Sequence, residues 1–368
     1  MNSLERVKLA LAHKEPDRVP IDFGGWLSGI SAKAYRNLAK YLGLKNESGG
    51  YDPGEELQQR FGADFRRITP KSPARERAVT NPNGSVTDKW SITRVHANDD
   101  DQIVNFPLKN ATTIADLDKF KWPDADPAGR YDTALQEAQA IHKRGFAVAA
   151  QPDICGVFEL SCWLCGFEKS LTDMALNPDF SRALFERICR LQEKYAHNYY
   201  GTVKNNIEYV QTGDDFGTQN GPFFSNDMYR ELVMPYHKRY NDAIRRETNA
   251  MIFQHSCGSV YKLLDSMIEA GVQILNPVQV SAAGMDPKRL KKEFGDRIVF
   301  HGAIDVQTIL PVKKPAEVRD EVKRIIDALA PGGGYILAPC HNIQPDTPIE
   351  NVLAIYSAVA KHRRSVRA

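Results

Sequence analysis

Short hydrophobic runs recur along the chain, and amphipathic stretches with helical periodicity separate most of them. The alternation is regular from about residue 123 onward and less regular before it. Strands that alternate with helices favour a parallel sheet whose connections are right-handed. The hydrophobic runs predict eight strands, at residues 18–25, 64–69, 146–151, 207–211, 250–255, 274–278, 298–301 and 335–339.

Eight strand–helix units predict a closed (β/α)₈ TIM barrel, and 368 residues fit one such α/β domain with insertions. An open doubly wound sheet is the alternative, but no Gly-x-Gly-x-x-Gly segment follows the first strand to support it. The region of about 70–125 interrupts the regular pattern. There the turn signal at Asn81–Gly84 and the alternation over 85–95 predict a hairpin insertion. We therefore expect one barrel domain over residues 1–368, with an N-terminal extension and this irregular insertion.

Composition narrows the range of partners and compartments. The formal net charge is +2 and neither sign dominates a long region, so we expect no nucleic-acid or membrane partner. No apolar run approaches the length of a membrane span, and the N-terminus lacks a signal core. Six cysteines in a chain of this length do not form the pattern of a disulfide framework. We expect a cytoplasmic protein with reduced thiols.

Polar residues gather at the carboxyl ends of the predicted strands, where the loops of a barrel converge on one mouth. Asp214 and Asp305 are candidates for orienting a substrate or donating a proton to it. Asn276 is a candidate either for substrate contact or for supporting a metal ligand. The residues that we assign to substrate binding are Asp22, Gln151, Gln211, Asn276 and His301. Asp153 and Asp215 also follow strands, and Asp22 and Asp64 flank the two early strands.

The most informative stretch follows the fifth predicted strand. His255 and Cys257 are two residues apart there, so both point to the same side of an extended chain. Cys340 follows the last strand, at the same end of the barrel. One imidazole and two thiolates suit zinc and leave a coordination position open for substrate. We predict that His255, Cys257 and Cys340 bind Zn²⁺, and we rank the neighbouring His341 below Cys340 because adjacent extended residues point to opposite faces.

Two further patterns have structural alternatives. Cys162 and Cys165 have the spacing of a metal or redox motif, but their apolar helical context and the lack of a second pair indicate core packing. Asp214 and Asp215 resemble an acidic metal pair. Since one of two adjacent side chains must point away, we expect a single substrate-facing carboxylate there, that of Asp214.

Five short segments, in order over nearly the whole chain, carry a resemblance to a known family. They are Asp17–Pro20 (DRVP), Gly213–Gln219 (GDDFGTQ), His255–Gly258 (HSCG), Leu275–Gln279 (LNPVQ) and Gly333–Cys340 (GGYILAPC). In these segments the chain resembles the uroporphyrinogen decarboxylase superfamily. That resemblance implies a (β/α)₈ barrel, in agreement with the strand count.

The superfamily has two branches with different chemistry. Decarboxylases carry an Arg-rich segment after the first strand that grips porphyrinogen carboxylates, whereas residues 21–26 here contain no Arg. Corrinoid-dependent methyltransferases bind zinc through a His-x-Cys…Cys pattern, which His255, Cys257 and Cys340 resemble. The resemblance therefore implies a zinc methyltransferase. A porphyrinogen decarboxylase is the alternative, and a non-catalytic binding protein is the third class.

The methyltransferase resemblance implies specific partners. A methyl group would move between a small molecule and a corrinoid, with zinc activating either a thiol acceptor or an ether donor. The chain has no Asp-x-His-x-x-Gly cobalamin signature, so the corrinoid would arrive on a partner protein. Aromatic residues near the predicted mouth favour a methoxylated aromatic donor over a thiol acceptor; these residues are Trp26, Phe216 and Tyr335.

Overall fold

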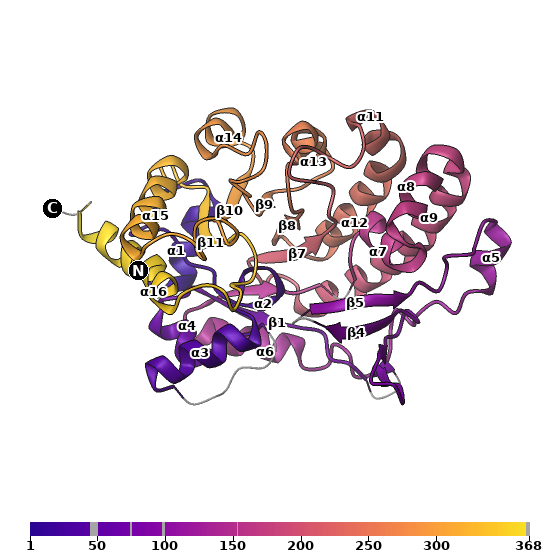
Figure 1. Ribbon diagram of the computed structural model, residues 1–368, viewed down its shortest axis with the longest axis horizontal. Coiled ribbons are helices and arrows are strands. Elements are labelled where there is room, and N and C mark those ends of the chain that lie inside the picture. Colours follow the sequence, from indigo (N-terminus) through magenta and orange to yellow (C-terminus); the bar gives the residue numbers. More distant parts are fainter. Residues whose placement is uncertain (45–50, 74–75, 98–99, 153, 366–368) are drawn as a thin grey trace.

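The computed structural model describes residues 1–44, 51–73, 76–97, 100–152 and 154–365, so the predicted strand-end residue Asp153 lies outside the described residues. Seven parallel strands form one curled sheet whose spatial order follows the sequence (Figure 1). The strands are β1 (Phe65–Ile68), β6 (Ala147–Ala150), β7 (Tyr209–Gly213), β8 (Met251–His255), β9 (Ile274–Asn276), β10 (Val299–Ile304) and β11 (Tyr335–Pro339). They match the last seven predicted strands, and the predicted TIM-barrel-like α/β fold is confirmed.

The eighth position of the barrel is occupied by a short extended segment instead of a full strand. Ile21 forms a parallel bridge with Leu337 of β11, and its carbonyl oxygen accepts the N–H of Asp64, just before β1, at 2.8 Å. Gly24 and Gly25 have φ angles of +146° and +71°, so the extended conformation ends there. The strand predicted at 18–25 is therefore wrong in extent, although it lies at the expected place between the first and last strands.

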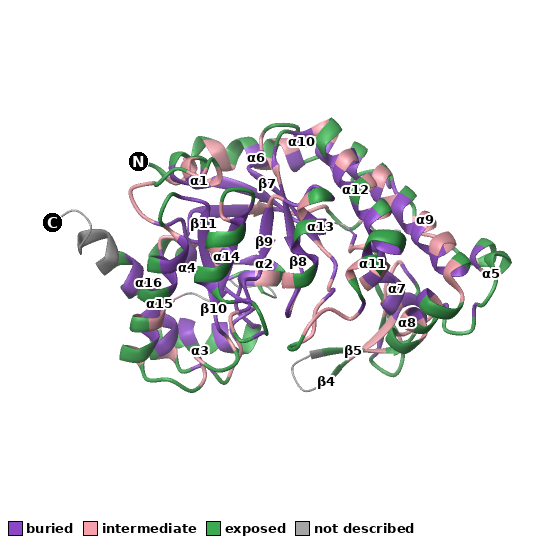
Figure 2. Ribbon diagram, turned by 90° about the horizontal axis from the view of Figure 1, so that it is seen from above, coloured by how far each residue is buried: buried purple, intermediate pink, exposed green. Residues whose placement is uncertain are grey.

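Helices surround the sheet, and Figure 2 shows buried strands inside helices whose outer faces are exposed. In α15, the buried residues recur at helical spacing, at Val318, Val322, Ile325, Ile326 and Leu329. The helices are α1 (Ser3–Leu11), α2 (Gly25–Ser28), α3 (Ala32–Leu42), α4 (Gly54–Arg60), α5 (Ile114–Lys119), α6 (Ala134–Lys143), α7 (Val157–Cys165), α8 (Phe167–Leu176), α9 (Pro178–Tyr195), α10 (Gly201–Val203), α11 (Asn226–Met228), α12 (Met234–Glu247), α13 (Leu264–Glu269), α14 (Pro287–Phe294), α15 (Pro315–Leu329) and α16 (Ile349–Ser365). In the described part of the chain, none of them has the length and apolarity that crossing a membrane requires.

Helix α1 closes the amino-terminal end of the barrel. Val7 belongs to the buried cluster that fills the barrel interior, together with strand residues such as Phe65, Ile274 and Val299. The helix begins with a capping box, in which Asn2 and Glu5 exchange hydrogen bonds between side chain and backbone. The α1 helix thus plugs the end of the barrel that lies opposite the predicted mouth.

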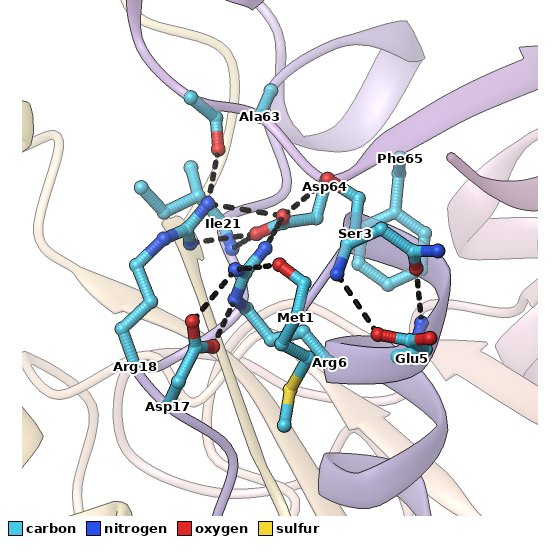
Figure 3. A network of polar contacts seen from close by, with 12 residues as sticks. Met1, Ser3, Glu5, Arg6, Asp17, Arg18, Ile21, Ala63, Asp64 and Phe65 are labelled. Carbon is cyan, nitrogen blue, oxygen red and sulfur yellow. Dashed lines mark hydrogen bonds and ion pairs between the residues drawn. The ribbon is translucent and has the colours of Figure 1, made fainter. Parts of the chain in front are cut away.

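A buried ionic network fastens this plug (Figure 3). The Asp64 carboxylate accepts hydrogen bonds from the guanidinium groups of Arg6 and Arg18, at 2.7 Å each, and from the N–H of Ile21 at 2.8 Å. Arg6 also pairs with Asp17 at 2.7 Å. Asp64, expected at a strand end, therefore holds the barrel closure and α1 together and lies before β1, far from the carboxyl ends of the strands.

The insertion is larger than the predicted hairpin. It forms a four-stranded antiparallel sheet in sequence order, and the predicted turn at Asn81–Gly84 connects its first two strands. Its link to the barrel is through α7, because the N–H of Leu108 donates to the carbonyl oxygen of Leu164 at 2.8 Å. The strands are β2 (Val79–Thr80), β3 (Val86–Thr87), β4 (Thr93–Ala97) and β5 (Asp100–Asn105).

Candidate metal centre

Strand β8 and the loop after β11 bring three possible metal ligands together. His255 ends β8 and is buried, and its Nε2 lies 3.3 Å from the Sγ of Cys257. One ligand atom each from His255, Cys257 and His341 lie within 4.8 Å of one another, and the two imidazole rings are 6.0 Å apart. Two imidazoles and a thiol are a donor set that zinc accepts. The structure thus brings His341, which ranked below Cys340 in the sequence, into the compact group.

Cys340 lies beside this group without belonging to it. Its buried thiol donates a hydrogen bond to the carbonyl oxygen of Val278, at 3.3 Å. A cavity of about 280 Å³ is lined by Cys340 together with Cys257 and His341. Cys257, Cys340 and His341 therefore face one cavity at the carboxyl ends of the strands, as expected for a barrel mouth.

Burial determines the protonation of both thiols. It raises the pKa of Cys257 above its ordinary range, and the negative charge of Asp215 adds to the rise. Burial also raises the pKa of Cys340, to about 12, with a contribution from Asp305. Both thiols are therefore protonated in the metal-free chain at neutral pH. A bound divalent cation reverses this preference, because coordination favours the thiolate.

The other ring nitrogen of His255 points into a buried polar chain. His255 Nδ1 lies 2.5 Å from Asn276 Oδ1, and Asn276 Nδ2 lies 2.8 Å from His301 Nδ1. His301 Nε2 in turn lies 3.0 Å from the carboxylate of Asp22. Asn276, His301 and Asp22 thus form a continuous series of hydrogen bonds behind the metal ligand His255. Their assignment to substrate binding stays a prediction.

The series of hydrogen bonds that begins at His255 ends in a buried ion pair. Asp22 Oδ1 is 2.7 Å from Arg67 Nη2, and its Oδ2 accepts the hydroxyl of Tyr209 at 2.6 Å. Within the described residues, Arg67 Nε and Nη1 and Gln151 Nε2 are buried without a hydrogen-bond partner. Gln151 Oε1 accepts the hydroxyl of Thr69 at 2.7 Å. Gln151 lies at the carboxyl end of β6, and its substrate role remains a prediction, as does that of Gln211, which is buried within β7.

The acidic pair after β7 is divided between two tasks. Asp214 accepts the N–H groups of Phe158 and Glu159 at 3.1 and 2.6 Å, so it caps the first turn of α7. Burial raises the pKa of Asp214 to about 8, although these N–H groups oppose the rise. Asp215 instead accepts the N–H of Cys257 at 2.7 Å and lies 3.6 Å from His255 Nε2. The carboxylate beside the metal group is therefore that of Asp215, and the substrate-facing role expected of Asp214 stays a prediction.

Asp305 lies at the rim of the cavity and caps the loop after β10. Its Oδ1 accepts the N–H groups of Gln307 and Thr308, at 2.7 and 2.6 Å. It lines the same cavity as Cys257 and Cys340. The catalytic roles predicted for Asp214 and Asp305 remain untested predictions, since the contacts given for both carboxylates are with backbone N–H groups.

Glu159 is a partly buried acid that the sequence did not single out. It lies in the first turn of α7. Burial, together with the negative charges of Asp215 and Asp214, raises its pKa well above the ordinary value. Its backbone N–H donates to Asp214, and the neighbouring Asp215 accepts the N–H of Cys257, so this turn of α7 lies near the metal group. The only available signal was an acidic residue early in an otherwise apolar helix.

The aromatic residues expected at the mouth have different environments. Trp26, on α2, is 51% exposed. Phe216 and Tyr335 are fully buried and belong to the hydrophobic core, so they are packing residues and the expectation that they line the mouth is wrong. Trp26 is therefore the only one of the three with an exposed ring.

Comparisons with known proteins agree with this barrel. Residues 99–362 match the family described as uroporphyrinogen decarboxylase (URO-D). The chain belongs to the URO-D family. The uroporphyrinogen decarboxylase of Coxiella burnetii is 22% identical over 273 residues, covering 70% of this chain and 69% of the relative. That of Ectopseudomonas mendocina is 25% identical over 197 residues, covering 52% and 51%. The superfamily membership inferred from the sequence segments is thus confirmed.

A solved structure extends the likeness over the whole URO-D chain. A methyltransferase from Methanosarcina mazei aligns with a TM-score of 0.66 and 18% identity, and the alignment covers 98% of this chain and 99% of the neighbour. At this identity the likeness establishes the fold. The alignment with this neighbour runs over nearly the whole of both chains.

Proposed function

We propose that the protein is a zinc-dependent methyltransferase that moves a methyl group between a small molecule and a corrinoid carried by a partner protein. The observation that supports it most is the compact group of His255, Cys257 and His341 in a URO-D barrel. A porphyrinogen decarboxylase does not need a metal site, whereas an enzyme that activates a thiol or an ether does.

The chain offers four side chains for the metal. His255 and Cys257 are common to both possible sets, and the third protein ligand is Cys340 or His341. Both candidates line the same cavity as Cys257. When bound, zinc supplies Lewis acidity to the oxygen or sulfur atom of the substrate. The nitrogen and sulfur donors present fit that metal.

The residues around the ligands have separate tasks in this proposal. Asp215 fixes the loop that carries Cys257 by accepting its backbone N–H. Glu159 is protonated because of its burial and its acidic neighbours. In this proposal it donates a proton to the ether oxygen of the substrate as the methyl group is transferred from that oxygen to the corrinoid. The two substrate classes that fit are a methoxylated aromatic compound, whose ring would lie against Trp26, and a thiol.

A URO-D-type decarboxylase is the second candidate. The relatives from Coxiella burnetii and Ectopseudomonas mendocina carry the decarboxylase name, at 22% and 25% identity. Against it, residues 21–26 provide no Arg for a substrate with many carboxylates. Zinc content and porphyrinogen turnover distinguish the two functions.

The deciding experiment measures zinc in the purified protein and in cysteine variants. We expect about one zinc ion per chain in the wild type and little in Cys257→Ser. Cys189→Ser is the matched control, because Cys189 is a fully buried thiol in α9 that donates to the carbonyl oxygen of Tyr236, outside the cavity. Zinc retention in Cys189→Ser together with loss in Cys257→Ser supports the proposal.

The same panel identifies the third ligand and the reaction. Comparing Cys340→Ser with His341→Asn shows which substitution releases zinc. The wild type is then incubated with reduced corrinoid protein and a set of methoxyarenes and thiols. Absence of zinc from the wild type, combined with turnover of a porphyrinogen, would establish the decarboxylase instead.

A further inference from the structure

We propose that a buried relay of hydrogen bonds fixes the tautomer of His255 that leaves its Nε2 atom free to bind a metal. The relay, defined as Arg67, Asp22, His301, Asn276 and His255, crosses the barrel interior from β1 to β8. Asn276, His301 and Asp22 are then positioning residues that act through His255. The consequence for metal binding rests on the proposed function, but the tautomer is a property of the metal-free chain.

The ion pair of Asp22 and Arg67 determines the direction of the first bond. Burial opposes ionisation of Asp22, but the Arg67 guanidinium, 2.7 Å away, and hydrogen bonds from His301 and Tyr209 lower its pKa below the ordinary range. An ionised carboxylate can only accept hydrogen bonds. The Tyr209 hydroxyl and His301 Nε2 must therefore both donate to it, at 2.6 and 3.0 Å.

The remaining directions follow from counting donors and acceptors. With a proton on Nε2, neutral His301 has a lone pair on Nδ1, which must accept from the amide nitrogen of Asn276. That leaves the amide oxygen of Asn276 facing His255 Nδ1, at 2.5 Å. Two acceptors cannot face each other at this distance, so His255 Nδ1 carries the hydrogen. Nε2 is then the bare nitrogen, on the side of Cys257.

The opposite arrangement carries an electrostatic penalty. If the Asn276 amide were reversed, its nitrogen would face His255 Nδ1, and the His255 proton would move to Nε2, where it would block the metal. The Asn276 oxygen would then face His301 Nδ1, and the His301 ring would need a second proton, on Nδ1, in addition to the one on Nε2. A charged imidazolium there would place another positive charge near the buried Arg67 guanidinium. Burial lowers the pKa of His301 and the charge of Arg67 acts in the same direction, so the pKa is below its ordinary value although the Asp22 carboxylate opposes both effects.

Strand register and packing hold the relay in place. His255 and Asn276 are direct partners in the pairing of β8 with β9. The Phe253 ring packs edge-on against His301, with ring centroids 4.9 Å apart. Asp22, Asn276 and His301 are fully buried, so water does not compete for these bonds. Metal-binding histidines generally donate their second N–H to a fixed acceptor, and loss of that acceptor weakens metal binding about 10- to 100-fold.

The first test reads the tautomers directly in the metal-free wild-type protein. Long-range ¹H–¹⁵N correlation spectra of histidine-labelled protein distinguish Nδ1–H from Nε2–H rings. Single histidine substitutions assign the nine histidine signals. We expect Nδ1–H for His255 and Nε2–H for His301. A proton on Nε2 of His255, or a doubly protonated His301 at neutral pH, would overturn the relay.

The second test measures zinc affinity by competition with a coloured chelator. Asn276→Leu removes the acceptor, so we expect a loss of about 10- to 100-fold. Asn276→Asp keeps an oxygen facing His255 Nδ1, although its second oxygen faces His301 Nδ1, so it should lose less affinity than Asn276→Leu. His237→Gln is the control, because His237 is an equally buried histidine outside the relay.

The outcomes separate a positioning role from a general structural one. Unchanged affinity in Asn276→Leu, or an equal loss in Asn276→Asp, would contradict the relay. A wild-type chain that binds no zinc would overturn the proposed function, whereas a reversed tautomer of His255 would overturn the relay alone.

Discussion

At the scale of single residues, burial decides which side chains carry charge near the carboxyl ends of the strands. It keeps the thiols of Cys257 and Cys340 protonated in the metal-free chain and favours the neutral form of Glu159. It also keeps His237 neutral behind β8. Only Asp22 keeps its charge in a fully buried position of the relay, because Arg67 compensates for its burial.

His237 makes the stability of the fold depend on pH. Its Nδ1 lies 2.8 Å from the Tyr229 hydroxyl and its Nε2 lies 3.1 Å from Gln254 Oε1. Burial lowers its pKa from 6.5 to about 4. Between these values the unfolded chain binds a proton that the folded chain does not. Stability contributed by neutral His237 is therefore present above pH 6.5 and lost as the pH falls to about 4, by about 3 kcal/mol in total.

The measurement for His237 is urea unfolding between pH 4 and 7, in the wild type and in His237→Gln. We expect the variant to lose less stability on acidification, since the titrating group is gone. Carboxylates titrate equally in both proteins, so the difference between the two curves isolates His237. Parallel curves would contradict the assignment.

Glu159 provides a test of proton donation. Because Glu159 is already neutral in the folded chain, Glu159→Gln preserves its shape and charge and should leave unfolding and zinc content nearly unchanged. We expect the rate of methyl transfer from an ether substrate to fall by about 100-fold or more. The rate is measured with saturating corrinoid protein. An unchanged rate would assign the proton to another group.

The sequence predicted part of this site for identifiable reasons. His255 and Cys257 could be predicted as neighbours because the alternation of an extended chain fixes their relative direction. The positions of Asp215 and His341 could not be predicted, because both lie on irregular segments after strands, where alternation no longer applies. Glu159 lies on a helix and approaches the ligands only through tertiary packing.

At the scale of elements, the loops after β7 and β8 interlock behind Cys257. A Cβ atom at Gly258 would lie 2.6 Å from the backbone carbon of Gly217 and from the Thr218 carbonyl oxygen. Gly258 also has a φ of +81°. The two loops can therefore approach this closely only with glycine at 258, and their contact sets the position of the thiol.

Gly258→Ala tests this contact, with Gly84→Ala as a matched control. Gly84 has the same φ of +81°, but nothing lies within 4 Å of its Cβ position. Both substitutions cost about 1 kcal/mol of backbone strain. We expect Gly258→Ala alone to cost additional stability and to weaken zinc binding, measured by urea unfolding and chelator competition. Equal effects of the two variants would show that the loop contact is unimportant.

Element prediction succeeded where apolar runs are uninterrupted. The strands from β6 onward have such runs, so their pattern identified them. The first predicted strand failed in extent because Pro20 lacks an N–H and Gly24 and Gly25 turn the chain. The insertion sheet was underestimated because β2 and β3 are two residues long and carry no measurable periodicity.

At the scale of the whole molecule, the two ends of the barrel have separate roles. The α1 plug and the Asp64 network close the amino-terminal end (Figure 3), and the metal ligands lie at the carboxyl ends of the strands. The barrel closure at Ile21 connects them, because Asp22 of the relay follows it directly in the chain. Stability and metal binding should therefore respond to different substitutions.

Asp64→Asn tests this separation. It removes, at a fully buried position, the carboxylate that binds Arg18 and one of the two carboxylates that bind Arg6, and such a loss typically costs about 3–5 kcal/mol. We expect that loss in urea unfolding, with zinc affinity of the folded protein nearly unchanged. A large fall in zinc affinity would show instead that the two ends are coupled through the closing segment.

Zinc K-edge X-ray absorption on the zinc-loaded wild-type protein tests the central claim most directly. We expect a mixed shell of sulfur at about 2.3 Å and nitrogen at about 2.0–2.1 Å, with the sulfur contribution reduced or lost in Cys257→Ser. A shell of oxygen ligands alone, or the same spectrum in Cys257→Ser, would contradict it.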